Sequence, residues 1–325
     1  HNVQIKDLET DVFINPKKNR EYEQYNNLCS VFLTYLLIDV FIKLNKSNLS
    51  FEDEKIYVLL ATVADVMPLR GINRILAQNV LKNFDINKNF IFSYLFKLLD
   101  LKKKLEINDL GYLIAPIINS AGRLGNANKI VELFTSDSDN DKKKILDNIF
   151  YLNKKRKLIE KNSLFEIDLD KLSNQKGVLF VYKYNIPEGI IGIIASRIKD
   201  YFNKPCIVFS NSNKIIKGSA RSTIDFNIGE HIHGALKNKI LLKGGGHNLA
   251  AGVTLFNSKI FIFKKFLDNI YKKKKITSNN YYISKLSLNS INNDFVKNIK
   301  LLGPFGSKNP NPVFLIEQVK ILKPK

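Results

Sequence analysis

The sequence predicts an α/β protein in which two domains are joined by a long helix. The chain has 325 residues, 45% of them hydrophobic, which is enough for about two domains with cores of their own. After Gly177, strand-like and helix-like segments alternate, as is typical of an α/β domain. Residues 138–172 are charged, have helical periodicity and contain neither Gly nor Pro, which indicates an exposed connecting helix.

The part before this helix is predicted to be mostly helical. It opens with a short strand, VFIN at 12–15, which ends at Pro16. Segments with helical periodicity follow at 28–44, 54–64, 72–84, 90–99 and 107–118. The second of these stops at ADVMPLRG, because Pro68 disfavours helical conformation at the residue before it.

The part after Gly177 has the α/β pattern. Apolar strands, GVLFVY and PCIVFS, flank a helix, GIIGIIASRIKDYF, and a strand and turn, IIKGSARS, leads to the helix NIGEHIHGALK. A loop and strand, GGGHNLAAGVTLF, precedes the last helix, NSKIFIFKKFLDNIYKKKK, and from about residue 278 the pattern is strand and turn. We therefore predict four parts, at 1–137, 138–175, 176–276 and 277–325.

The charge favours a polyanionic partner. The formal net charge is +21 and the isoelectric point is about 9.7, and a protein this basic usually meets nucleic acid. The chain is also rich in Lys, Asn and Ile, which an AT-rich genome favours without any selection for binding. The lysine runs at 102–104, 142–144 and 272–275 are more often solvated faces than sites, so the charge supports nucleic-acid binding without establishing it.

Other features favour an intracellular protein without a membrane segment. Cys29 and Cys206 form neither a metal-ligand spacing nor a disulfide framework, which fits a reducing compartment. The longest apolar stretch, at 30–42, is too short to span a bilayer and contains Asp39. No signal peptide is visible, and the chain opens without an initiator Met, so we expect an internal piece of a longer protein.

Three consecutive glycines and a histidine stand in LKGGGHNLAAG at 242–252. Glycine loses more backbone freedom on folding than any other residue, so a triplet indicates a place where a side chain would collide or where the backbone approaches a phosphate. The alternative is an ordinary loop before the strand AAGVTLF, and the local pattern leaves both open.

Further candidate residues carry phosphate or metal chemistry. Asp65, just past an apolar helix, is suited to a metal ion or to a helix cap. Asn119 and Arg123 are four apart on one helix face, and Arg binds phosphate bidentately, although it also ties helix ends to carboxylates. Ser219 and Arg221 share one side of a predicted strand, where they form either a phosphate contact or an ordinary exposed edge.

The order of these motifs resembles the RecJ family, the single-strand-specific 5′→3′ exonucleases of the DHH phosphoesterase superfamily. The resemblance runs through TVADVMPL, PIINSAGRLG, EGIIGIIASRI, KGSARS, GGGHNLAAG and PFGSKNPNPVF, over essentially the whole chain. It implies a partial DHH phosphoesterase domain, a connecting helix, an α/β DHH-associated domain and the start of a β-rich OB-fold. It also implies two-metal hydrolysis of phosphodiester bonds in DNA recombination and repair, with Mn²⁺ or Mg²⁺.

The resemblance assigns roles to single residues. Asp65 and His1 match metal ligands, and the other ligands would precede residue 1. The DNA 5′ phosphate and backbone are assigned to Asn119, Arg123, Ser219, Arg221 and the glycine–histidine loop, Gly244, Gly245, Gly246 and His247. Single-stranded DNA is the implied substrate, held between two domains too close together for a duplex, with a single-strand-binding protein and a helicase as implied partners. The resemblance also implies a monomer in the bacterial cytoplasm.

Departures from the family pattern keep two alternatives open. Pro187, Phe32 and Ala115 replace a polar residue and two glycines of the usual motifs, and they bear on activity more than on fold. One alternative is a smaller DHH phosphodiesterase for oligonucleotides or cyclic dinucleotides. Such proteins end soon after their glycine–histidine loop, so the long segment that follows His247 argues against this alternative. The other is a nucleic-acid-binding piece that does not hydrolyse its ligand.

Overall fold

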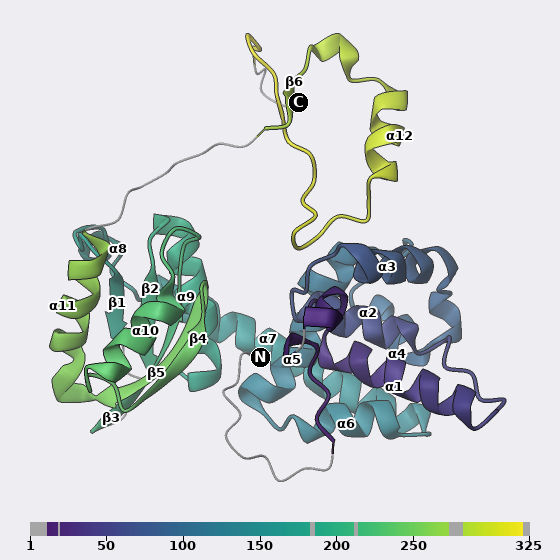
Figure 1. Cartoon of the computed structure of the whole chain (residues 1–325), viewed down its shortest axis with the longest axis horizontal. Coiled ribbons are helices and arrows are strands. Elements are labelled where there is room, and N and C mark those ends of the chain that lie inside the picture. Colours follow the sequence, from purple (N-terminus) through teal and green to yellow (C-terminus); the bar gives the residue numbers. More distant parts are fainter. Residues whose placement is uncertain (1–11, 19, 183–185, 211–213, 273–281, 321–325) are drawn as a thin grey trace. The chain divides into compact units, whose positions relative to one another are not determined.

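The computed structural model describes residues 12–18, 20–182, 186–210, 214–272 and 282–320. It divides into two compact units: His1–Pro116 together with Asn280–Lys325, and Ile117–Asn279 (Figure 1). Within the described residues, no helix is both long and apolar enough to cross a membrane.

The first unit is built from helices. They are α1 (Ser30–Leu44), α2 (Lys55–Ala64), α3 (Gly71–Asn83) and α4 (Phe90–Leu98). Short 3-10 turns lie at Pro16–Lys18, Arg20–Tyr25 and Ile86–Lys88. A π-helical stretch, Asp109–Ile114, leads into α5 (Ala115–Leu124), which belongs to the second unit from Ile117 onward. The core is formed by side chains that are almost fully buried: Ile56, Leu59, Phe92, Leu95 and Leu110.

The strand predicted at VFIN is wrong. Residues 12–15 have no regular structure, and Val12 and Ile14 are 73% and 56% exposed. A strand needs a neighbour that completes its hydrogen-bond ladder. Around these residues the described part of the first unit has helices and 3-10 turns, so an apolar, β-branched segment alone does not form a strand there.

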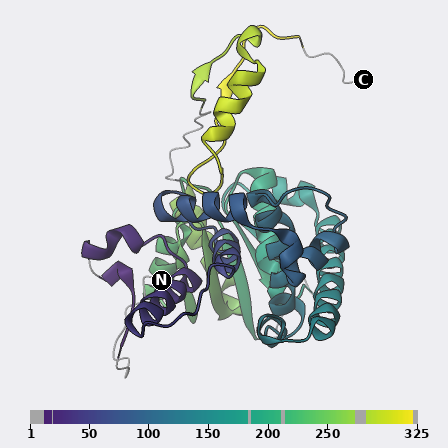
Figure 2. The ribbon, with the colours of Figure 1, turned by 90° about the vertical axis from the view of Figure 1, so that its right-hand side faces the viewer.

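The carboxy-terminal segment of the first unit contains a helix that the sequence did not predict. Strands β6 (Ser284–Lys285) and β7 (Phe314–Leu315) pair in parallel, and α12 (Asn293–Leu301) lies between them in the chain. The Asn292 side chain caps α12 by accepting a hydrogen bond from the Phe295 amide, and the Phe295 ring lies 5.4 Å from that of Phe314. Figure 2 draws the ribbon of this segment in yellow-green and yellow. The Asn292 cap and the helical spacing of apolar residues in NDFVKNIKL favour a helix here, although the neighbouring residues are typical of turns.

The second unit contains a five-stranded mixed sheet in the order β1-β2-β3-β5-β4. Its strands are β1 (Leu179–Tyr182), β2 (Cys206–Ser210), β3 (Ile215–Arg221), β4 (Lys243–His247) and β5 (Ala250–Phe256). β1 is parallel to β2, and all other neighbours are antiparallel. The alternation of strands and helices predicted after Gly177 is confirmed, and with it the α/β class.

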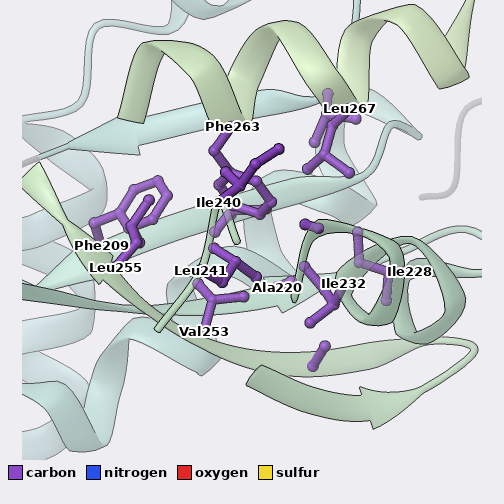
Figure 3. Close-up of a cluster of buried hydrophobic side chains, with 14 of the residues drawn as sticks. Phe209, Ala220, Ile228, Ile232, Ile240, Leu241, Val253, Leu255, Phe263 and Leu267 are labelled. Atoms are coloured by element: carbon purple, nitrogen blue, oxygen red, sulfur yellow. The ribbon is translucent and has the colours of Figure 1, made fainter. Parts of the chain in front are cut away.

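Helices cover both faces of this sheet. Helices α10 (Ile228–Lys237) and α11 (Ile260–Tyr271) bury one face, where Phe209, Leu255, Phe263 and Leu267 are fully enclosed (Figure 3). Helix α9 (Glu188–Phe202) buries the other face with a second apolar cluster, into which Leu124 and Leu164 also pack. Each such fully buried side chain contributes about 1.5–3 kcal/mol relative to exposure, so the two clusters fix the sheet and α9 rigidly.

The connecting helix is shorter than predicted. Helix α7 (Asp139–Phe165) packs on α6 (Asn128–Thr135) and α9, and a separate helix, α8 (Leu169–Ser173), follows. The break comes from Asp168, whose side chain accepts a hydrogen bond from the Lys171 amide at 2.8 Å and so starts a new helix. Ile167 before it is buried in the α9 cluster, which holds the break in place.

Candidate nucleic-acid interface

The candidate site is on the α9 side of the sheet, where strand alternation gathers polar side chains and bare backbone. On β3, Ser219 and Arg221 are on the same side of the strand. Their cross-strand partners on β5 are Gly252 and Ala250, and Gly252 in turn faces Gly245 on β4. Helix α9 packs against β2 and β3, and Gly245 and Gly252 have nothing within 4 Å of the position a Cβ would take. Two strands therefore present open backbone beside an arginine.

Arg123 enters this site from the end of α5. Its Nη1 donates a hydrogen bond to the Gly189 carbonyl oxygen at 2.9 Å, which ties α5 to the first turn of α9. The two backbones are so close that a Cβ on Gly189 would lie 2.3 Å from the Arg123 carbonyl oxygen. Glycine at position 189 is therefore required for Arg123 to reach its place.

Arg221 is held at the end of β3. Its Nη1 donates to the Ser219 hydroxyl at 3.0 Å and to the Ala220 carbonyl oxygen at 2.9 Å. Gly192 on α9 leaves the room for this side chain, since a Cβ there would lie 2.9 Å from Nη2 of Arg221 and 3.0 Å from the Ser219 hydroxyl. The Ser219 hydroxyl accepts from Arg221 and keeps its own proton for a ligand.

The two arginines are close enough to repel each other. Burial lowers the pKa of Arg221, and the charge of Arg123 lowers it further. The pKa of Arg123 is lowered by burial and then by Arg156, against the attraction of Glu160. Like charges that share a half-buried place cost free energy unless an anion compensates them.

The carboxylate that attracts Arg123 is already engaged. The two carboxylate oxygens of Glu160, on α7, pair with Arg156 at 2.9 Å and with Arg197 at 2.8 Å. Among the ion pairs of the described residues, neither Arg123 nor Arg221 has a carboxylate partner. The site therefore has excess positive charge, together with several free N–H donors and a hydroxyl, which is the donor set that a phosphate group accepts.

Asn119 lies one helical turn before Arg123 on α5 and is exposed. No contact links it to the arginines or to Ser219 in the part of the chain that the structure describes. The structure thus brings together Arg123, Ser219 and Arg221, and it leaves Asn119 beside them on the surface.

The glycine–histidine segment is a strand and not the predicted loop. Lys243–His247 form β4, an edge strand paired with β5. Side chains would collide at two of its glycines: a Cβ on Gly244 would lie 2.7 Å from Ile232 of α10, and one on Gly246 2.2 Å from the Ala250 carbonyl oxygen. Steric need therefore explains Gly244 and Gly246, whereas Gly245 faces open space.

His247 orders the turn between β4 and β5. Its Nδ1 accepts a hydrogen bond from the Leu249 amide at 3.3 Å, so the neutral ring has its proton on Nε2. The residue is exposed, and its backbone packs on Gly229 of α10, where a Cβ would lie 2.9 Å from the His247 carbonyl. The Nε2–H group thus remains a donor for a ligand.

Asp65 belongs to the first unit. It is exposed and directly follows α2, and the turn after it is fixed by the buried Asn73, which donates to the carbonyl oxygens of Pro68 at 3.0 Å and Asn27 at 2.8 Å. His1 lies outside the described residues. Within those residues, no three His, Cys, Asp or Glu side chains lie together in a way that could hold a metal ion, so Asp65 alone is not a complete metal site.

Sequence reasoning missed the residues that position the arginines and the turn after Asp65. Gly189 and Gly192 were visible as EGIIG, a pair three apart that shares one face of a helix, and Asn73 followed the Asp65 motif. Buried charge on α7 gave no clear signal, because Arg156 and Glu160 stand in a lysine-rich stretch. Of the departures from the family pattern, Phe32 and Ala115 are buried in cores and Pro187 directly precedes α9, so all three are compatible with the fold.

Comparison with known proteins agrees with this architecture. Residues 175–273 match the model of the DHHA1 domain, and residues 284–325 match that of the RecJ OB domain. Two similar relatives are the single-stranded-DNA-specific exonuclease RecJ of Haemophilus influenzae, 29% identical over 94% of this chain and 57% of its own, and that of Escherichia coli, 30% identical over 79% of this chain and 47% of its own. The chain thus spans about half the length of these relatives.

A solved structure gives the same result. RecJ of Thermus thermophilus in complex with Mn²⁺ is 25% identical and has a TM-score of 0.72, over 81% of this chain and 40% of that one. The same protein has also been solved with Mg²⁺, with a TM-score of 0.70. The domain matches, the relatives and the fold together show that this chain is similar to the RecJ exonucleases over most of its own length and over about half of theirs.

Proposed function

We propose that this chain is part of a single-strand-specific 5′→3′ exonuclease and that its second unit holds the 5′ phosphate of the DNA strand. The observation that supports this is the arginine pair, Arg123 and Arg221, which is half-buried and without a carboxylate partner among the described ion pairs. A terminal phosphate carries more charge than an internal phosphodiester, so this site favours strand ends. Anchoring the 5′ end gives such an enzyme its direction.

The other predicted contacts support the path of the strand. Gly245 and Gly252 leave the β4–β5 surface bare, which allows a sugar–phosphate backbone to approach closely. Nε2–H of His247 and the exposed Asn119 are our candidate donors to this backbone. Exclusion of a duplex by a narrow passage between the two units stays a prediction.

For hydrolysis we propose that Asp65 contributes one carboxylate to a Mn²⁺ or Mg²⁺ site, as the resemblance implies. The RecJ of Thermus thermophilus binds both ions. The described residues lack a full ligand set, so the remaining ligands, His1 among the candidates, lie outside them. When bound, such ions activate water and stabilise charge on the scissile phosphate.

The proposal is tested by end binding in EDTA, so that no metal-dependent cutting interferes. Arg221→Ala is expected to weaken binding of a 5′-phosphorylated single strand about 10- to 100-fold, because hydrogen bonds to charged groups contribute about 1.5–3 kcal/mol. The same strand with a 5′ hydroxyl should be nearly unaffected. Lys265→Ala, which removes an exposed charge from α11, is the matched control and should leave both affinities unchanged. Equal losses for both strands in Arg221→Ala would contradict the proposal.

A second candidate function is strand binding without hydrolysis by these 325 residues. It is favoured by the position of Asp65, which has no second and third metal-binding side chain beside it among the described residues. Mn²⁺-dependent digestion distinguishes the two: a full-length protein should cut 5′-phosphorylated single strands and lose this activity in Asp65→Ala while it still binds them. If Asp65→Ala cut at the original rate, the metal assignment would be wrong. Monomeric state, cytoplasmic location and contacts with a single-strand-binding protein or a helicase stay predictions.

A further inference from the structure

We propose that Ile224 and Leu249 form an aliphatic contact surface for the nucleobase of the terminal nucleotide, an inference that rests on the proposed 5′-phosphate site. Ile224, in the loop between β3 and α10, is 87% exposed, and Leu249, in the turn between β4 and β5, is 45% exposed. Two such side chains at the edge of a polar site are available for an apolar partner.

The loop that carries Ile224 is held in one shape. The Ser222 hydroxyl donates to the Phe226 carbonyl oxygen at 2.6 Å, and the Phe226 amide donates to the Thr223 carbonyl oxygen at 3.1 Å. Phe226 itself is buried in the core beneath α10. Ile224 is therefore presented at the tip of an anchored loop, and little conformational entropy is lost when a ligand packs on it.

Two further hydrogen bonds join this loop to the turn that carries Leu249. The Ser222 amide donates to the Leu249 carbonyl oxygen at 2.9 Å, and the Ile228 amide to the Asn248 carbonyl oxygen at 3.2 Å. The two apolar residues thus belong to one rigid substructure at one end of the sheet.

This substructure adjoins the arginine pair. Arg221 and Ala250 are cross-strand partners, Ile224 follows Arg221 by three residues, and Leu249 directly precedes Ala250. Three residues span at most about 11 Å of extended chain, so both apolar side chains start within one nucleotide's reach of the phosphate site.

The ligand that fits such a pair is a base attached to the bound phosphate. An unpaired nucleotide offers two apolar base faces, and proteins that bind single strands use such faces without reading sequence. Ile and Leu side chains have no hydrogen-bond donors or acceptors, so a contact with them discriminates little between the four bases. In a duplex the terminal base is paired and stacked, so this contact also favours a single strand.

The experiment compares 5′-phosphorylated single strands whose first nucleotide is either intact or abasic, with binding measured in EDTA. The unmodified chain should bind the abasic strand about three- to tenfold more weakly. The double variant Ile224→Ser/Leu249→Ser should lose a similar factor on the intact strand and nothing further on the abasic strand. Ile215→Ser removes an exposed isoleucine from the opposite end of β3 and should behave like the unmodified chain.

The outcomes separate this inference from the proposed function. If the unmodified chain prefers a 5′ phosphate but binds abasic and intact strands equally, the base contact is wrong and the phosphate site stands. If the double variant lost further affinity for the abasic strand as well, the base contact would also be overturned, and thermal unfolding would show whether the variant had lost its fold. If no preference for a 5′ phosphate is found at all, the proposed function itself fails. Thermal unfolding of each variant shows whether the fold is retained.

Discussion

Single atoms decide whether the phosphate site can form. The packing of α5 and α9 depends on the missing side chain at Gly189, and the space for Arg221 depends on that at Gly192. These two glycines differ in what a methyl group would meet: backbone at Gly189, and the mobile end of a side chain at Gly192. Substitutions at the two positions therefore separate stability from ligand binding.

We predict that Gly192→Ala weakens 5′-phosphate binding severalfold and leaves stability nearly unchanged, because the guanidinium of Arg221 can move aside. Gly189→Ala should instead lower the free energy of unfolding by about 1–3 kcal/mol, since the Arg123 backbone cannot yield. Equilibrium denaturation and end-binding assays on both variants check this. Equal losses of stability in the two variants would contradict the account.

His231 gives the second unit a pH dependence. Burial lowers the pKa of His231 below its ordinary value of 6.5, against the attraction of Glu230, and its ring lies 4.4 Å from that of Phe226. The folded state therefore binds this proton less readily than the unfolded state does. Above about pH 6.5 the ring is neutral in both states and the folded state keeps its full stability. As the pH falls from there towards the lower pKa of the folded state, the unfolded state takes up the proton first, and the free energy of unfolding decreases.

His231→Gln is accordingly expected to lose less stability than the unmodified chain between about pH 7 and pH 5. Denaturant unfolding at several pH values measures this. His233→Gln, an exposed histidine on the same helix, is the matched control and should follow the unmodified chain. The assignment fails if His231→Gln shows the full loss.

At the scale of elements, β4 shows how one glycine run serves two purposes. Gly244 and Gly246 face the core side of the sheet and allow close packing, and Gly245 faces the open side. The run forms an edge strand because β5 supplies its hydrogen-bond partners. Its alternation, rather than a flexible loop, places the bare backbone beside Ser219 and Arg221.

Substitutions along β4 should therefore alternate in their effects. Gly245→Ala is expected to leave stability unchanged and to weaken single-strand binding, because a methyl group would stand where the strand passes. Gly246→Ala should destabilise the second unit, since its Cβ would meet the β5 backbone. Thermal unfolding and single-strand titrations distinguish the two. Unchanged binding in Gly245→Ala would remove β4 from the strand path.

The sequence predicted elements where the pattern was local and long. The periodicity of 28–44, 54–64, 72–84 and 90–99 predicted α1 to α4 within a few residues, and the buried strands β1 and β2 were predicted from apolar runs. Failures came where partners decide the outcome. Residues 12–15 (VFIN) have no strand beside them among the described residues and form no strand, whereas residues 244–247 (GGGH) pair with β5 and do. Helix α12 forms because Asn292 caps it, although the segment around it is rich in turn residues.

At the scale of the whole molecule, the site is assembled from distant parts of the chain. Arg123 and Arg221 are separated by more than ninety residues, and they are brought together by the α5–α9 contact, the packing of α9 on β3 and the β3 register. Residue patterns alone suggested phosphate chemistry at each place separately, and the family resemblance supplied the reason to group them. The unpaired charge of the pair was visible only in the fold, because it depends on Glu160 being engaged by Arg156 and Arg197.

The exonuclease proposal involves residues from both units of the molecule. It requires that Asp65 and the arginine pair act on the same strand. The net charge of +21 adds general attraction for DNA, which weakens with salt and does not discriminate strand ends. End discrimination must therefore come from the arginine pair.

The most direct test is the ratio of the dissociation constants of the unmodified chain for one single strand with a 5′ hydroxyl and with a 5′ phosphate. We predict at least about a tenfold preference for the phosphate, retained at high salt because the site is half-buried. Equal affinity for the two strands would mean that Arg123 and Arg221 do not bind the 5′ phosphate, and it would contradict the account.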